Sequence, residues 1–248
     1  MDHQVGRVME IIGRDFPGAI VMFTSDHGDM LGNHRLQMKN AAMYQEIANI
    51  PLIVRGGEKG KVVTTPASHI DIVPTVMEYM GLPLPRLLEG KSMLAQFRDS
   101  TLQINDYVYT EFTRYEVDHD GFGGLQMMRG VTDGRFKLVV HLCDTDELYD
   151  MQADPDEVEN LIDCSDTADV RDRLHDALLA HMNHTRDPYR GYQWAVRPWR
   201  KDKIPAWEND AFTRQRENEE YEPRQLDYDT GLPMVQAVRS KKLYDAKK

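Results

Sequence analysis

Residues 19–32 read AIVMFTSDHGDMLG, an apolar run that passes directly into a polar turn. The run Ala19–Thr24 has the length and composition of a strand that is buried on both faces of a parallel sheet. Ser25–Asp29 follows it and predicts a turn at the carboxyl end of that strand. Because open α/β sheets bind ligands at this edge, we expect a functional site here.

Helices and a second strand flank this segment. Apolar residues recur at helical spacing in Gln4–Arg14, and Pro51–Arg55 is another apolar run that suits a buried strand. Asp71–Met80 predicts a helix that ends at Gly81, and its apolar stripe is expected to consist of Ile72, Val76 and Met80. Residues 1–100 are therefore predicted to form an α/β unit.

Residues 101–186 have a different character. Three short runs are rich in β-branched and aromatic residues, and an Asp-Gly turn at 133–134 separates two of them: Tyr107–Phe112, Leu125–Thr132 and Phe136–His141. Val170–Met182 has the periodicity of an amphipathic helix; the stripe comprises Val170, Leu174, Ala177, Leu178 and His181. We predict a small antiparallel sheet with a helix, followed by an extended tail over residues 187–248.

The chain is acidic and contains few cysteines. It has 41 Asp and Glu against 30 Lys and Arg in 248 residues, a net charge of −11. Cys143–Asp176 contains thirteen of the acidic residues and two arginines, and we interpret it as a solvated face. Such a surface repels phosphate backbones, so nucleic-acid binding is not expected. Cys143 and Cys164 are expected to be separate thiols, and no apolar run is long enough to span a bilayer.

Asp26 and His27 are the first candidates for chemistry. A carboxylate and an imidazole together suit a divalent metal ion, although taken alone the pair fits better a plain turn in which Asp26 caps backbone N–H groups. Lys39 lies thirteen residues after Asp26, in a loop that also contains His34 and Arg35. An ammonium group near a metal ion suits a sulfuryl or phosphoryl oxygen. The combination favours a site for an anionic substrate.

Several ordered motifs resemble one family. Thr24–Gly32, followed by Lys39 and Ile50–Val54, resembles the second half of a sulfatase of the alkaline-phosphatase superfamily. The similarity covers about residues 5–200 and continues through Ser68–Thr75, Glu89–Ser92, Glu147–Asp150, Asp154–Glu157, Asn160-Leu161 and Arg186–Trp194. It implies part of an alkaline-phosphatase-like mixed or parallel sheet with helices, followed by a small antiparallel sheet and helix.

The resemblance also implies roles for individual residues. Asp26 and His27 would ligate the divalent cation, which is usually calcium in sulfatases, with magnesium or manganese as alternatives. Lys39 would contact the anionic oxygens of the ester and the leaving-group side. His34 would be a neighbour of these groups in the catalytic site.

Two details of the motifs extend this interpretation. The sequence has His27 where many arylsulfatases carry Asn, so it is also similar to phosphonate and phosphate-ester hydrolases of the same superfamily. His69 and Asp71 are expected to hold the loop or cap the following helix rather than touch substrate.

The sequence also departs from the family pattern. A sulfatase uses a formylglycine made from Cys or Ser in a Cys/Ser-x-Pro-x-Arg motif, and neither Cys143 nor Cys164 lies in one. The metal-binding Asp pair of the family's N-terminal part is absent as well. We therefore expect the chain to be a C-terminal portion whose formylglycine lies upstream. Alone, it is expected to bind metal weakly or not at all, because calcium prefers six to eight oxygen ligands.

Three functions remain open at this stage. The first is the C-terminal part of a metal-dependent sulfatase that acts on a sulfate-ester small molecule or sugar. The second is a phosphonate monoester or phosphodiester hydrolase, and the third is a non-catalytic interaction or oligomerisation module. The aromatic tail is expected to pack over the core or across a homo-oligomer interface; its residues include Trp194, Trp199, Trp207, Tyr221, Tyr228 and Tyr244.

Overall fold

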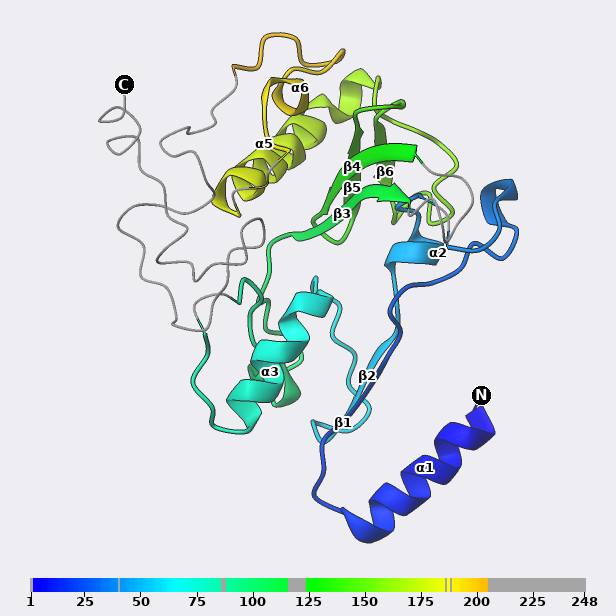
Figure 1. Ribbon diagram of the computed structural model, residues 1–248, viewed down its shortest axis with the longest axis vertical. Coiled ribbons are helices and arrows are strands. Elements are labelled where there is room, and N and C mark those ends of the chain that lie inside the picture. Colours follow the sequence, from blue (N-terminus) through cyan, green and yellow to red (C-terminus); the bar gives the residue numbers. More distant parts are fainter. Residues whose placement is uncertain are drawn as a thin grey trace, which may run out of the picture.

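The computed structural model describes residues 2–39, 41–85, 88–115, 124–185, 187 and 189–204. An N-terminal part with two strands and two longer helices lies beside a C-terminal part built on a four-stranded sheet (Figure 1). The N-terminal elements are α1 (Asp2–Asp15), β1 (Val21–Thr24), η1 (Asn33–Arg35), α2 (Gln45–Ala48), β2 (Leu52–Arg55), η2 (His69–Asp71), α3 (Ile72–Tyr79) and η3 (Leu94–Phe97). The predicted mixed α/β class is confirmed.

Strands β1 and β2 pair with each other in antiparallel register, with Val21 opposite Arg55 and Thr24 opposite Leu52. Among the described residues no further strand joins this pair. Phe23 is 37% exposed and Ile53 is 63% exposed. The prediction of burial on both faces of a parallel sheet is therefore wrong for this part of the chain, because a two-stranded ribbon cannot cover its own faces.

The C-terminal sheet is antiparallel throughout and has the order β3-β4-β5-β6. Its strands are β3 (Val108–Tyr115), β4 (Gly124–Thr132), β5 (Phe136–His141) and β6 (Glu147–Asp150). Gly134 has a φ of 94° in the turn between β4 and β5, a conformation that glycine adopts without strain. The predicted strands and hairpin are confirmed.

The two faces of this sheet are covered by different parts of the chain. Successive side chains on a strand point to opposite faces, so Leu138 and Val139 of β5 lie in different cores. Helix α5 (Ala168–His184) covers one face, in a cluster of Val131, Leu138, Val140, Leu148, Ile162, Leu174, Leu178, Met182 and Trp194. Ala41 and Met43 of the N-terminal part cover the other face, against Met128 and Val139. The sheet thereby joins the two parts.

The two longer predicted helices differ in how they are buried. The α5 stripe is confirmed at Leu174 and Leu178, which are fully buried. The stripe predicted for α3 is wrong, because Pro74 and Thr75 are the buried residues of that helix while Val76 and Met80 are exposed. Val73, Val76 and Tyr79 of α3, and Met80 at its C-terminal end, are each at least 40% exposed. No described helix has the length and apolar composition needed to cross a bilayer.

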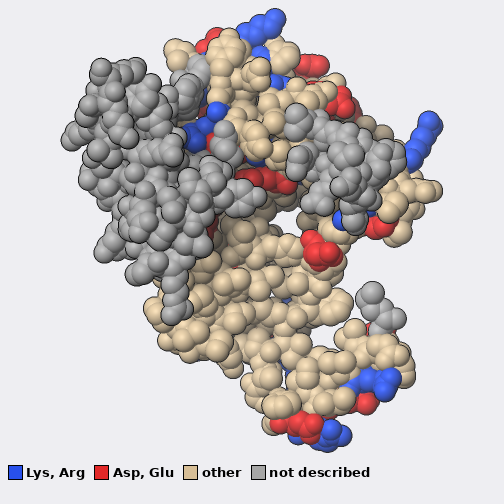
Figure 2. Space-filling view, in the orientation of Figure 1, with Lys and Arg blue, Asp and Glu red and all other residues tan. Residues whose placement is uncertain are grey.

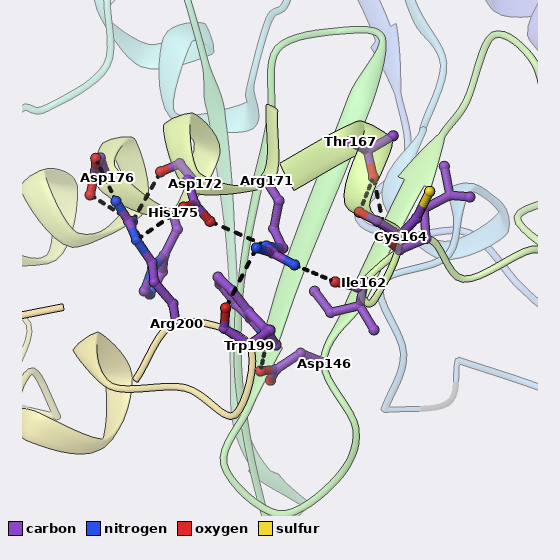
Figure 3. Close-up of polar contacts among 11 residues, drawn as sticks. Asp146, Ile162, Cys164, Thr167, Arg171, Asp172, His175, Asp176, Trp199 and Arg200 are labelled. Carbon is purple, nitrogen blue, oxygen red and sulfur yellow. Dashed lines mark hydrogen bonds and ion pairs between the residues drawn. The ribbon is translucent and has the colours of Figure 1, made fainter. Parts of the chain in front are cut away.

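The chain after α5 returns over its own domain, as Figure 3 shows. Trp194, in α6 (Tyr192–Ala195), is buried in the core. The Trp199 ring lies against Arg171, with the guanidinium carbon 4.6 Å from the ring centroid, and its Nε1 donates to Asp146 Oδ2 at 2.8 Å. Trp194 and Trp199 thus pack over the core, which is one of the two arrangements expected for the aromatic tail. Trp207, Tyr221, Tyr228 and Tyr244 lie outside the described residues.

The acidic segment is not simply a solvated face. Asp146, Asp150 and Glu157 are each at most 8% exposed. Asp146 accepts from Arg197 at 2.8 Å and Asp150 from Arg135 at 2.7 Å. Glu157 pairs with Lys137. These carboxylates can be buried because basic side chains from other parts of the chain neutralise them, which the local sequence could not reveal. The prediction of two separate thiols is confirmed.

Candidate functional site

Asp26 and His27 lie in the turn directly after β1. Asp26 Oδ1 accepts the His27 backbone N–H at 3.0 Å, and this hydrogen bond lowers the pKa of the Asp26 carboxyl group. The Asp26 side chain is 85% exposed, so its ionised carboxylate faces solvent. Asp26 Oδ2 lies 3.5 Å from His27 Nε2. Two donor atoms of different chemistry therefore converge on one point at the end of the strand.

The His27 ring is oriented as a metal ligand would be. Its Nδ1 lies 2.8 Å from the backbone oxygen of Gly28, which can only accept, so Nδ1 carries the proton. In the neutral ring this leaves the lone pair on Nε2, which faces Asp26. A metal-binding histidine commonly donates its other ring N–H to a backbone carbonyl in this way. The tautomer of His27 thus suits coordination through Nε2.

The Asp26 and His27 pair fits two positions around a divalent cation. Donor atoms 3.5 Å apart can both reach one ion at bond lengths of about 2.0–2.5 Å. Within the described ranges, no group of three or more His, Cys, Asp or Glu side chains is placed to hold a metal. The carboxylate and imidazole present are therefore compatible with the cation that the family implies, but they make only part of a coordination shell.

Lys39 and His34 lie in the loop that follows. Lys39 is exposed near the end of this loop. The His34 ring stacks on Tyr44, with centroids 3.8 Å apart and an interplanar angle of 6°. Four non-glycine residues of the loop have positive φ angles, an uncommon conformation that neighbouring structure must hold in place; they are Leu31, His34, Arg35 and Met38. The structure brings His34 to Tyr44 and leaves the roles of Lys39 and His34 as predictions.

A short segment around α2 supports both the turn and the loop. Gly28 N donates to Ile47 O at 3.0 Å, and a Cβ at Gly28 would lie 1.7 Å from Glu46 O. Asn33 Nδ2 donates to Glu46 Oε1 at 2.7 Å. Tyr44 and Glu46 were not among the residues singled out in the sequence. No motif in the sequence around them indicated a function. Their role in supporting the turn and the loop follows only from the contact between α2 and the turn.

His69 and Asp71 have the structural roles that were predicted for them. His69 Nε2 donates to Ser25 O at 2.8 Å and so ties the turn to η2. Asp71 is buried and forms a capping box with Ser68. Its carboxylate also accepts from Lys91 N and from Asn105 Nδ2, both at 2.8 Å. These contacts hold the segments on either side of α3 together.

Comparison with known proteins identifies the family. Residues 32–184 match the family described as N-sulphoglucosamine sulphohydrolase, C-terminal. The chain belongs to the sulfatase family. It corresponds to the C-terminal region of these proteins of the alkaline-phosphatase superfamily, as the motifs around Asp26, Asp71 and Glu157 indicated.

Relatives and solved structures agree with this assignment. The chain is 46% identical to the uncharacterized sulfatase YidJ of Escherichia coli K12, over 94% of this chain and 46% of the relative. It is 27% identical to N-acetylglucosamine-6-O-sulfatase of Bacteroides thetaiotaomicron, over 75% of this chain and 34% of the relative. BT4656, solved in complex with its substrate D-glucosamine-2-N,6-O-disulfate, has a TM-score of 0.68 at 25% identity, over 76% of this chain and 39% of that one. The sulfatase chain thus spans less than half the length of these proteins.

A second group of neighbours acts on a different ester. The phosphonate monoester hydrolase of Agrobacterium radiobacter has a TM-score of 0.61 and 27% identity, over 72% of this chain and 38% of that one. The shared fold therefore occurs with both sulfate and phosphonate chemistry. Sulfatase membership is shown by the family match, whereas the reaction of the whole protein has to be argued from the site.

Proposed function

We propose that this chain supplies the C-terminal part of the active site of a metal-dependent sulfatase that hydrolyses sulfate esters of a small molecule or sugar. The observation that carries the proposal is the convergence of Asp26 Oδ2 and His27 Nε2 at 3.5 Å, with the His27 tautomer set by Gly28 O. The sugar part of the proposal is supported by the named substrates of two relatives.

The residues of this chain would stabilise the negative charge of the ester oxygens. Asp26 and His27 would hold a divalent cation, calcium first and magnesium or manganese as alternatives, which when bound neutralises anionic oxygens of the ester. Lys39 would donate hydrogen bonds to those oxygens and to the leaving-group side. His34, whose ring stacks on Tyr44, would be a neighbour of these groups in the catalytic site. The nucleophile would be a formylglycine in the preceding part of the protein, because this chain contains no Cys/Ser-x-Pro-x-Arg motif.

Phosphonate monoester or phosphodiester hydrolysis is the second candidate. His27 stands where many arylsulfatases carry Asn, and the phosphonate monoester hydrolase shares the fold at 27% identity. Both substrate classes present anionic oxygens on a tetrahedral centre, so the same cation and lysine could serve either. The relative rates on the two esters decide between these reactions.

The test joins this chain to the N-terminal half of the E. coli relative. The fusion is assayed on an aryl sulfate, an aryl phosphonate monoester and 6-O-sulfated N-acetylglucosamine, beside the intact relative. We expect sulfate ester hydrolysis that chelator abolishes and calcium restores. Lys39→Ala and Asp26→Asn should each lower kcat/KM by about 100-fold or more, as expected for losing a group that stabilises transition-state charge.

Lys61→Ala is the matched control, because Lys61 is an exposed lysine that forms a surface ion pair with Glu58. It should leave the rates unchanged. A higher rate on the phosphonate than on either sulfate would favour the second candidate. A folded fusion that is inactive on all three esters, while the intact relative is active, would favour a non-catalytic module.

A further inference from the structure

Lys137 and Glu157 form a buried ion pair on the face of the C-terminal sheet opposite α5. Lys137 Nζ contacts Glu157 Oε1, and the two residues are 5% and 1% exposed. Burial lowers the pKa of the Lys137 ammonium and raises the pKa of the Glu157 carboxyl. Buried charged pairs are seldom needed for stability alone, since apolar residues of similar volume often do as well. Their contacts therefore need another explanation.

Both side chains also bind the backbone of the N-terminal part. Lys137 Nζ donates to Met43 O, and Glu157 Oε2 accepts from Gln45 N at 2.7 Å. Gln45 Nε2 lies 2.9 Å from Met151 Sδ, which adds a side-chain contact to the same region. A donor and an acceptor thus fix the position and direction of the chain just before α2. An apolar pair could fill the space but could not make these two hydrogen bonds.

The segment held in this way is the one that supports the candidate site. From Tyr44 to Ile47 it provides the stacking partner of His34, the carboxylate that accepts from Asn33 and the carbonyl that accepts from Gly28. Gly28 immediately follows Asp26 and His27. The path from the buried pair to the proposed metal ligands therefore consists of short, directional contacts without an interruption.

We propose that Lys137 and Glu157 are positioning residues: through the backbone of residues 43–47 they set the geometry of the turn and loop that carry Asp26, His27 and Lys39. Through this pair, the C-terminal part would fix the positions of Asp26, His27 and Lys39, although neither Lys137 nor Glu157 is a proposed ligand. The inference rests on the proposed function for its catalytic consequence, while the structural coupling itself does not depend on it.

Hydrogen exchange of the full chain tests the coupling directly. Lys137→Met combined with Glu157→Met removes both charges and both backbone partners, and should make the Gln45, Ile47 and Gly28 amides exchange at least about ten-fold faster. Amides in the β4–β5 ladder, such as that of Val139, should be unchanged. Glu157→Gln leaves one acceptor oxygen for two donors, Gln45 N and Lys137 Nζ, because its NH2 group can only donate. It should therefore give exchange rates between those of the wild type and those of the double methionine variant.

A purely structural pair predicts a different pattern. In that case the double methionine variant would show either normal protection throughout or a uniform loss that includes Val139, and each result would overturn the proposal. Glu58→Met with Lys61→Met, which removes an exposed ion pair at 3.3 Å, is the control and should change neither region. If the double methionine variant does not fold, loss of Gln45 and Gly28 protection in Lys137→Met alone decides the question.

Activity of the fusion supplies the second readout. The double methionine variant should lower kcat/KM by about 10- to 100-fold, the range expected when a site is misplaced without loss of its groups. It should also raise the calcium concentration for half-maximal activity, and Glu157→Gln, which keeps one of the two acceptor oxygens, should give intermediate values of both. Unchanged kinetics beside fast loop exchange would overturn the catalytic role. An inactive wild-type fusion would refute the proposed function, whereas hydrogen exchange would still decide the coupling.

Discussion

His175 has no exposed surface, and both of its ring nitrogens are engaged (Figure 3). Nε2 donates to Trp194 O at 2.8 Å, and Nδ1 accepts from Arg200 Nη1 at 3.1 Å. The ring therefore ties the segment after α5 to that helix only in its neutral form. Burial lowers the pKa of His175 to about 4, and burial together with the charge of His184 lowers the pKa of His181 to about 4.

These shifts predict a loss of stability in mild acid. His175 binds a proton more tightly in the unfolded chain than in the folded one. The stabilisation that neutral His175 gives to the folded chain is therefore complete above about pH 6.5 and is lost as the pH falls toward 4. His175→Gln should therefore destabilise the chain at pH 7, and its difference from wild type should shrink at pH 5. Urea unfolding at both pH values measures this. His3→Gln, on the exposed surface of α1, is the control and should change the urea midpoint little.

At the scale of elements, the approach of α2 to the turn after β1 shapes the candidate site. Gly28 is required there because any side chain would collide with the Glu46 carbonyl. The turn and α2 belong to segments that are separated by the whole loop of η1. The sequence predicted the turn, but it did not predict that α2 touches it, since contact between segments depends on how the intervening loop folds back.

Gly28→Ala should therefore disturb the site more than a typical glycine substitution. A Cβ at 1.7 Å from Glu46 O must push α2 or the turn aside, at a cost of about 1–3 kcal/mol in the free energy of unfolding. The rate of sulfate hydrolysis by the fusion should also fall, because the turn that carries Asp26 and His27 would be displaced. Gly18→Ala is the control, because a Cβ there meets nothing within 4 Å. Equal urea midpoints for the two variants would show that α2 is not held against the turn.

For the molecule as a whole, the main feature is the set of exposed apolar side chains on α3. The surface over α3 carries few charged side chains in Figure 2. The exposed apolar residues of α3 and its C-terminal end include Val73, Val76, Tyr79 and Met80. Several large apolar side chains exposed on one helix are typical of an interface. The length of the relatives, more than twice that of this chain, indicates what would cover it.

We expect the separately expressed N-terminal half of the E. coli relative to bind this apolar surface. Tyr79→Asp should weaken the complex by about ten-fold or more, because a charge would be buried without a partner. Val158→Asp is the matched control, since Val158 is an exposed apolar residue of the C-terminal part. Titration followed by size exclusion measures both. Equal affinity of the two variants for the N-terminal half would place the interface elsewhere. Without that half, the chain is expected to self-associate through α3.

The sequence by itself determined the local elements and the family. Apolar periodicity located α1 and α5, and runs rich in β-branched and aromatic residues located β3, β4 and β5. The ordered motifs from Asp26 to Glu157 identified a sulfatase C-terminal region. These features depend on neighbours along the chain. Only the tertiary structure showed that β1 pairs antiparallel with β2, that the stripe of α3 is exposed, and that Lys137 and Glu157 hold the backbone beside the candidate site. Those outcomes depend on which distant segments are present to cover a face or neutralise a charge, and local patterns carry no information about that.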